Sequence, residues 1–112
     1  MSEYFNKSDL DKFNDGELSE LHKEHWDNFL NYYGNVMSEG KLSVRTKALI
    51  ALAVAHAEKC PYCIDAYTTK CLDLGLSKEE MMEAIHVASA MQAGITLVTN
   101  VQMKNIIDDM EF

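Results

Sequence analysis

The spacing of apolar side chains along the chain predicts helices. Between about residues 17 and 37, side chains such as Leu18, Leu21 and Phe29 recur at three- and four-residue intervals, the period of a helix with one apolar face. No segment alternates β-branched and polar residues as a half-buried strand would. The sequence has one proline and five glycines, so few positions interrupt the helices. We therefore predict an all-α fold of about five to six helices.

Capping residues indicate where the central helices begin and end. Ser43 is a typical N-cap residue for a helix that runs to about residue 57. Cys60 occupies the N-cap position of the next helix, and Pro61 follows at the first helical position, which proline favours. Gly75 suits the left-handed residue that follows a helix end. These signals predict helices over about 43–57 and 61–74.

The C-terminal third is predicted to form two helices. Ser77 and Glu80 have the spacing of a capping box, which opens a helix that runs to about residue 93. Gly94 is expected to break or kink the pattern before a last helix from Ile95 to about Asp109.

The helix over 43–57 is apolar around its whole circumference in the segment 48–55. A helix without a polar face must be buried on every side. A chain of 112 residues leaves much of its surface exposed and can hardly provide that burial alone. We therefore expect an oligomer.

Length and composition predict one domain over residues 1–112, with a loose N-terminal arm at 1–16. The formal net charge of −8 argues against nucleic-acid partners and anionic membrane surfaces, both of which require a basic face. The polar N-terminus lacks the features of a secretory signal, and the stretch 84–103 is too polar for a membrane span. These observations favour a cytoplasmic protein.

The pair Cys60 and Cys63 carries the most specific chemistry in the sequence. Structural disulfides are rare in the cytosol, where a C-x-x-C pair is more often catalytic or metal-binding. At a helix start, free N–H groups and the helix dipole stabilise a thiolate, the reactive form of cysteine. By position alone, Cys60 is expected to be the more acidic thiol. Glycine-rich phosphate loops and dinucleotide fingerprints are absent from the sequence, and we expect no cofactor.

Four residues near the pair are candidate partners for it. Helical spacing places Cys63, Tyr67 and Cys71 in one row, so the Tyr67 phenol could donate a hydrogen bond to a thiol, while Cys71 is expected to be a small core residue. His56 and His86 could shuttle protons near neutral pH. With both cysteines they would also supply the two sulfur and two nitrogen ligands of a zinc site, but strong zinc signatures carry two short ligand pairs and this sequence has one. We expect no metal site.

The segment from Leu42 to about Ala93 resembles the alkylhydroperoxidase (AhpD-like) core of the carboxymuconolactone decarboxylase superfamily. The resemblance rests on LSVRTKALIALAVA followed by CPYCIDAYT. Together with AVAH and EAIHVA, these residues more narrowly resemble peroxidase-like proteins associated with arsenosugar biosynthesis. The resemblance implies an all-α fold that assembles into homotrimers or homohexamers.

The same resemblance implies reduction of hydroperoxides or other small electrophiles by the dithiol. Cys63 would attack, Cys60 would resolve the sulfenic acid into a disulfide, and an external dithiol would reduce it. The usual family pattern has a glutamate and a histidine where this sequence has Ala48 and Tyr67, so the usual proton relay is missing. Either Tyr67, His56 and His86 replace that relay, or the dithiol serves another purpose. The alternatives are a non-catalytic protein that binds a metal or metalloid, and a lactone decarboxylase, for which a dithiol is not required.

Overall fold

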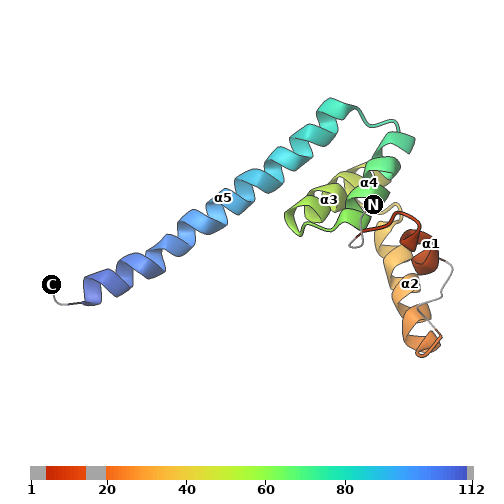
Figure 1. The fold of residues 1–112 in the computed structure, drawn as a ribbon. Coiled ribbons are helices and arrows are strands. Elements are labelled where there is room, and N and C mark those ends of the chain that lie inside the picture. The colour runs from red at the N-terminus through yellow and green to blue at the C-terminus, as the bar shows by residue number, and fades with distance from the viewer. Residues whose placement is uncertain (1–4, 15–19, 111–112) are drawn as a thin grey trace.

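The computed structural model describes residues 5–14 and 20–110, and this part of the chain is all-helical. Figure 1 shows the arrangement of the helices. In chain order they are α1 (Asp9–Asn14), α2 (Lys23–Met37), α3 (Val44–Ala57), α4 (Pro61–Asp73) and α5 (Lys78–Asp109).

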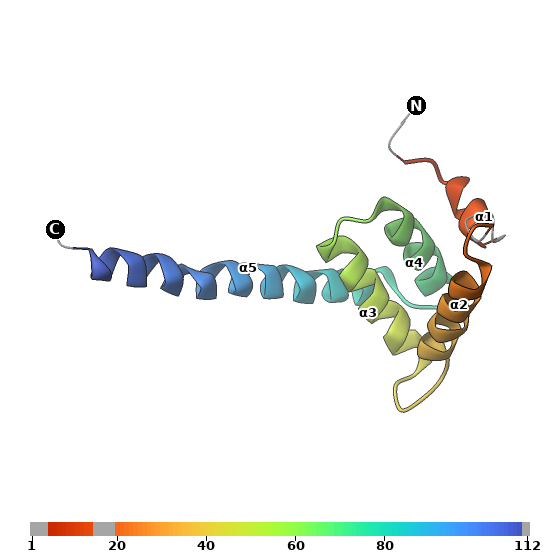
Figure 2. The same ribbon diagram turned by 90° about the horizontal axis from the view of Figure 1, so that it is seen from below.

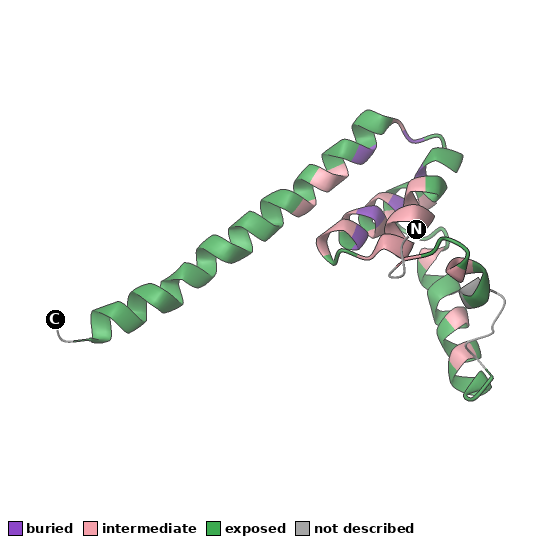
Figure 3. Ribbon diagram, viewed as in Figure 1, coloured by how far each residue is buried: buried purple, intermediate pink, exposed green. Residues whose placement is uncertain are grey.

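The core is small and lies where α3 packs against α4 and against the beginning of α5. Leu52 of α3 and Cys71 of α4 are completely buried at its centre. Figure 3 shows that buried positions are confined to this part of the molecule. The core cluster consists of Ala48, Leu52, Cys71, Leu76 and Met81.

The helix ends follow the predicted caps. The Ser43 side chain accepts a hydrogen bond from the Thr46 N–H at the start of α3. Ser77 and Glu80 form the full capping box of α5, with each side chain bonded to the backbone N–H of the other. Gly75 has φ +78°, a left-handed conformation that glycine adopts without steric cost. The sequence therefore correctly predicted which residues begin α3 and α5 and which glycine follows the end of α4.

The predicted break at Gly94 is wrong, because α5 is continuous from Lys78 to Asp109. Relative to alanine, a glycine inside a helix lowers the stability of the helix by only about 1 kcal/mol. The backbone hydrogen bonds of the helix before and after the glycine can offset this loss. Glycine ends a helix when its backbone turns left-handed, as Gly75 does and Gly94 does not. The last two predicted helices are therefore one.

In the part of the predicted loose N-terminal arm that the structure describes, residues 9–14 form α1. The Tyr62 hydroxyl donates to Asp9 Oδ2 over 2.8 Å, and the Phe5 and Tyr62 ring centroids are 4.8 Å apart. Residues 1–4 and 15–16 of the predicted arm lie outside the described residues, as do residues 17–19 of the next predicted helix. Within the described part, α2 begins at Lys23 rather than near residue 17.

The second half of α5 projects away from the other helices, as Figures 1 and 2 show from two directions. The radius of gyration is 18.9 Å, whereas a compact domain of this length has about 13 Å. Exposed apolar side chains continue along this half, including Leu97 and Val98. By length and composition α5 could cross a membrane, although core helices of soluble proteins meet the same test. Within the described residues, the side chains in this half of α5 are not buried against any other helix.

Candidate active site at the dithiol

The α3–α4 connection places Cys60 at the N-terminus of α4. Its backbone N–H donates to the Ala55 carbonyl over 3.0 Å, which fixes the turn out of α3. Its own backbone is extended, and its sulfur accepts a hydrogen bond from the Cys63 N–H over 3.2 Å. Pro61 takes the first helical position, as predicted. The Cys60 sulfur thus caps α4 and faces the positive end of the helix dipole.

Cys63 lies in the first turn of α4 and is less acidic than an ordinary cysteine. Burial raises the pKa of its thiol to about 11, assisted by its hydrogen bond to the Cys60 sulfur and by the charge of a Cys60 thiolate. Both cysteines are free thiols. The Cys60 sulfur thus lies where a helix N-terminus favours a thiolate, whereas burial and Cys60 itself oppose one at Cys63.

Tyr67 lies one turn beyond Cys63 on α4 and packs against the core cluster. Its hydroxyl is hydrogen-bonded to the hydroxyl of Tyr33, which comes from α2. Burial raises the pKa of the Tyr33 phenol, and a negative charge on Cys63 raises it further. Tyr33 is therefore close enough to the Cys63 sulfur for the two groups to interact electrostatically. A pair of tyrosines therefore stands beside Cys63.

Sequence reasoning missed Tyr33 as a site residue. It was visible only as one member of an aromatic row on α2, in which Trp26 contacts Phe29 and Phe29 contacts Tyr33 at centroid distances of 5.6 and 5.7 Å. Nothing in the spacing of α2 indicates that Tyr33 meets α4, because the two tyrosines are 34 positions apart. Only the packing of the helices reveals the pair.

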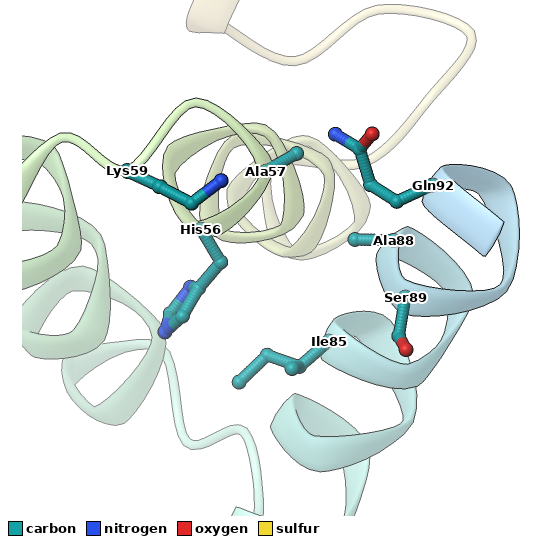
Figure 4. Close-up of a pocket in the computed structure, with 7 residues that line it drawn as sticks. All are labelled: His56, Ala57, Lys59, Ile85, Ala88, Ser89 and Gln92. Carbon is teal, nitrogen blue, oxygen red and sulfur yellow. The ribbon is translucent and has the colours of Figure 1, made fainter. Parts of the chain in front are cut away.

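His56 turns toward a different part of the molecule. Its Nδ1 bonds to the Leu52 carbonyl over 2.9 Å, so this nitrogen carries the proton and donates. The ring lines a cleft of about 190 Å³ between α3 and α5, shown in Figure 4. Within the described residues, no hydrogen bond joins His56 to either cysteine. The other lining residues are Ala57, Lys59, Ile85, Ala88, Ser89 and Gln92.

His86 is exposed on α5 and is absent from the lining of that cleft. The arrangement of four ligands required for zinc is not assembled either. Over residues 5–14 and 20–110, no three side chains of His, Cys, Asp or Glu come together so as to hold a metal ion. The structure thus brings Tyr67 to a new partner beside the thiols and leaves both histidines without a bond to them.

Two further positions have the environment of core residues. Cys71 is completely buried, and its burial raises the pKa of its thiol, so it is poorly suited to exchange chemistry. Ala48 is 1% exposed within the same cluster. An ionised carboxylate at Ala48 would require a partner there, whereas alanine packs without one. The site therefore consists of two thiols and two phenols.

Comparison with known proteins agrees with this fold. The family model for the carboxymuconolactone decarboxylase family matches residues 24–101. This chain belongs to the carboxymuconolactone decarboxylase family. Its core is AhpD-like, and the family includes both decarboxylases and alkylhydroperoxidases. The match covers nearly all of α2, all of α3 and α4 and most of α5, and therefore the whole dithiol site.

Two individual proteins are similar to this chain. The chain is 36% identical over 96 residues to "Uncharacterized protein 4 in cox locus" from Paracoccus denitrificans, which covers 86% of each chain. It is also similar to a crystal structure of a Methanobacterium thermoautotrophicum protein from a structural genomics programme. That similarity has a TM-score of 0.73 at 32% identity and covers 77% of this chain and 97% of the other. The narrower resemblance to arsenosugar-associated proteins stays a prediction.

Proposed function

We propose that this protein is a dithiol oxidoreductase that reduces hydroperoxides, with Cys63 attacking and Cys60 resolving. The observation that carries the proposal is the bond from the Cys63 N–H to the Cys60 sulfur over 3.2 Å, which brings a capping sulfur and a second thiol together. The pair lies in the first turn of α4, where a thiolate is stabilised. Tyr67 and Tyr33 supply hydroxyl groups on the Cys63 side.

The reaction is expected to run in three steps. The Cys63 thiolate attacks the outer peroxide oxygen; an S–O bond forms, the O–O bond breaks, and the leaving alkoxide takes up one proton to become an alcohol. Cys60 then attacks the sulfenic acid on Cys63, which forms the disulfide and releases water. An external dithiol, itself oxidised to a disulfide, returns both cysteines to thiols.

The hydrogen bond between the sulfurs suggests how Cys63 becomes reactive despite a pKa of about 11. A Cys60 thiolate accepts the Cys63 proton along this bond, so the charge moves to Cys63 as it attacks. Cys60 is left as a thiol, ready for the resolving step. This route gives Cys60 the role of base and keeps the attacking role on Cys63.

Mass spectrometry after one equivalent of peroxide tests the proposal. The intact protein is expected to lose two hydrogens, with the disulfide between Cys60 and Cys63. Cys60→Ser should instead accumulate a sulfenic acid on Cys63, whereas Cys71→Ala should behave like the unmodified chain. Thiols that stay reduced under peroxide contradict a peroxidase. Stoichiometric metalloid in the purified protein would instead indicate a binding protein, and turnover of a lactone would indicate a decarboxylase.

We also propose that the protein is a homotrimer or homohexamer in the cytoplasm, where a cycling dithiol meets reductants. Ile50 and Val54 on α3 are 49% and 55% exposed, and the projecting half of α5 is apolar on several sides. Further copies of this chain would cover these surfaces. Light scattering should give a mass three or six times 12.7 kDa, and Val98→Glu with Val101→Glu should lower it. A monomer at micromolar concentration contradicts the proposal.

A further inference from the structure

We propose that Tyr33 is a positioning residue, which holds the Tyr67 hydroxyl so that Tyr67 protonates the oxygen leaving from a peroxide at Cys63. The inference rests on the proposed peroxidase function and assigns the proton donor for its first step. The observation behind it is the hydrogen bond between the Tyr33 and Tyr67 hydroxyls, which joins α2 to α4 beside the dithiol.

Either hydroxyl can be the donor in this bond, and we assign that role to Tyr33. Each tyrosine hydroxyl has one proton to donate and lone pairs that accept. When Tyr33 donates to the Tyr67 oxygen, the proton of Tyr67 is left to point elsewhere. Because Tyr67 lies one helical turn from Cys63, that proton is available to a peroxide bound at the sulfur.

The surroundings fix both rings. Tyr67 packs against the core cluster, and Tyr33 packs against Phe29 with a centroid distance of 5.7 Å. The end of α2 is held to α3 by Lys47, whose Nζ donates to the Val36 and Ser38 carbonyls, each over 2.7 Å. The position of the Tyr33 hydroxyl therefore depends on the docking of α2, which places it opposite α4.

The chemistry of the first step requires such a donor. A phenol, with a pKa of about 10, readily protonates the far more basic alkoxide that leaves the peroxide. As the S–O bond forms and the O–O bond breaks, Tyr67 gives its proton to the leaving oxygen. Tyr33 then passes its proton to the Tyr67 phenolate and regains one from water, because Tyr33 is 37% exposed. Protons and electrons balance without any further co-reactant.

Two reactions of Cys63 with different proton requirements provide the test. Peroxide expels an oxygen that must be protonated, whereas iodoacetamide expels iodide, which needs no proton. In the full-length protein, Tyr33→Phe is expected to slow oxidation by peroxide about 3- to 10-fold and to leave alkylation by iodoacetamide unchanged. Tyr67→Phe should slow oxidation more, by the order of 100-fold expected for a general acid, again without slowing alkylation.

The neighbouring tyrosine offers a matched control. Tyr32 is on the same helix but is 67% exposed, so Tyr32→Phe should leave both rates unchanged. The double variant of Tyr33 and Tyr67 should be no slower than Tyr67→Phe alone, because Tyr33 acts through Tyr67.

Three outcomes would overturn the inference. If peroxide oxidises Cys63 in Tyr33→Phe as fast as in the protein without substitutions, Tyr33 does not position the donor. If oxidation and alkylation slow equally, Tyr33 acts only on the structure around Cys63. In both cases the unmodified chain still forms its disulfide, so the proposed function stands. If the unmodified chain does not react with peroxide at all, the proposed function fails and the inference fails with it.

Discussion

The backbone N–H of Cys63 donates a hydrogen bond to the sulfur of Cys60 over 3.2 Å, so one cysteine of the pair caps the helix that carries the other. This relationship makes the two thiols unequal. Cys60 faces the N–H groups that favour a thiolate, whereas Cys63 keeps its proton because burial and Cys60 both raise its pKa.

Replacing Cys60 with serine is expected to lower the pKa of Cys63 from about 11. The substitution removes the charge of the neighbouring thiolate, one of the causes that raise the pKa, and leaves burial in place. Titration of the thiolate absorbance against pH measures the change. Cys71→Ala is the control, because Cys71 lies in the core two turns away. An unchanged Cys63 titration in Cys60→Ser would show that the sulfurs do not interact.

The stability of the protein is expected to fall as the pH rises from about 9 to about 11. The folded pKa of Cys63 is about 11 and the ordinary value is 9.0, so the unfolded chain loses this proton first. The contribution is therefore fully present below pH 9 and is lost as the pH rises through the folded pKa. Urea unfolding at a series of pH values measures it.

Cys63→Ser is the matched variant for that series. Its stability should fall less steeply over the same range, although burial of Cys71 raises the pKa of that thiol too and leaves part of the slope. An equally steep fall in Cys63→Ser would contradict the assignment of this pH dependence to Cys63.

Ser77→Ala is expected to destabilise the fold by about 1 kcal/mol, the usual cost of losing an N-cap. The Ser77 hydroxyl accepts from the Glu80 N–H over 3.0 Å and the Glu80 side chain accepts from the Ser77 N–H over 2.8 Å, so the change breaks half of the capping box. Thermal or urea unfolding measures the loss. Ser89→Ala, an exposed change in the interior of the same helix, should cost almost nothing. Equal effects of the two substitutions would argue against the box.

Two glycines are expected to respond in opposite directions to alanine. At Gly34, inside α2, a Cβ would meet nothing within 4 Å, so Gly34→Ala should stabilise the protein by up to about 1 kcal/mol. At Gly75, with φ +78°, Gly75→Ala should destabilise it by about 1 kcal/mol, since alanine is strained there. Urea midpoints of both variants provide the measurement. Destabilisation by Gly34→Ala would reveal a contact of α2 that this chain alone does not explain.

Local signals in the sequence were enough for much of the fold. Ser43, Cys60 and Ser77 act as caps where predicted, because a capping side chain bonds to a backbone N–H only two or three residues away. The same locality explains the failure at Gly94. A glycine signals a possible end, but whether its backbone turns left-handed depends on the helix around it, and α5 runs on.

By itself the sequence determined the helical class, the family and the dithiol at the start of a helix, since each depends on residues close together in the chain. Only the tertiary structure decided which side chains surround the thiols. It packed Tyr33 of α2 against Tyr67 of α4, directed His56 into a cleft with α5, and left His86 exposed. Contacts between distant segments depend on how whole helices dock, and docking is set by the combined packing of many side chains rather than by any local spacing.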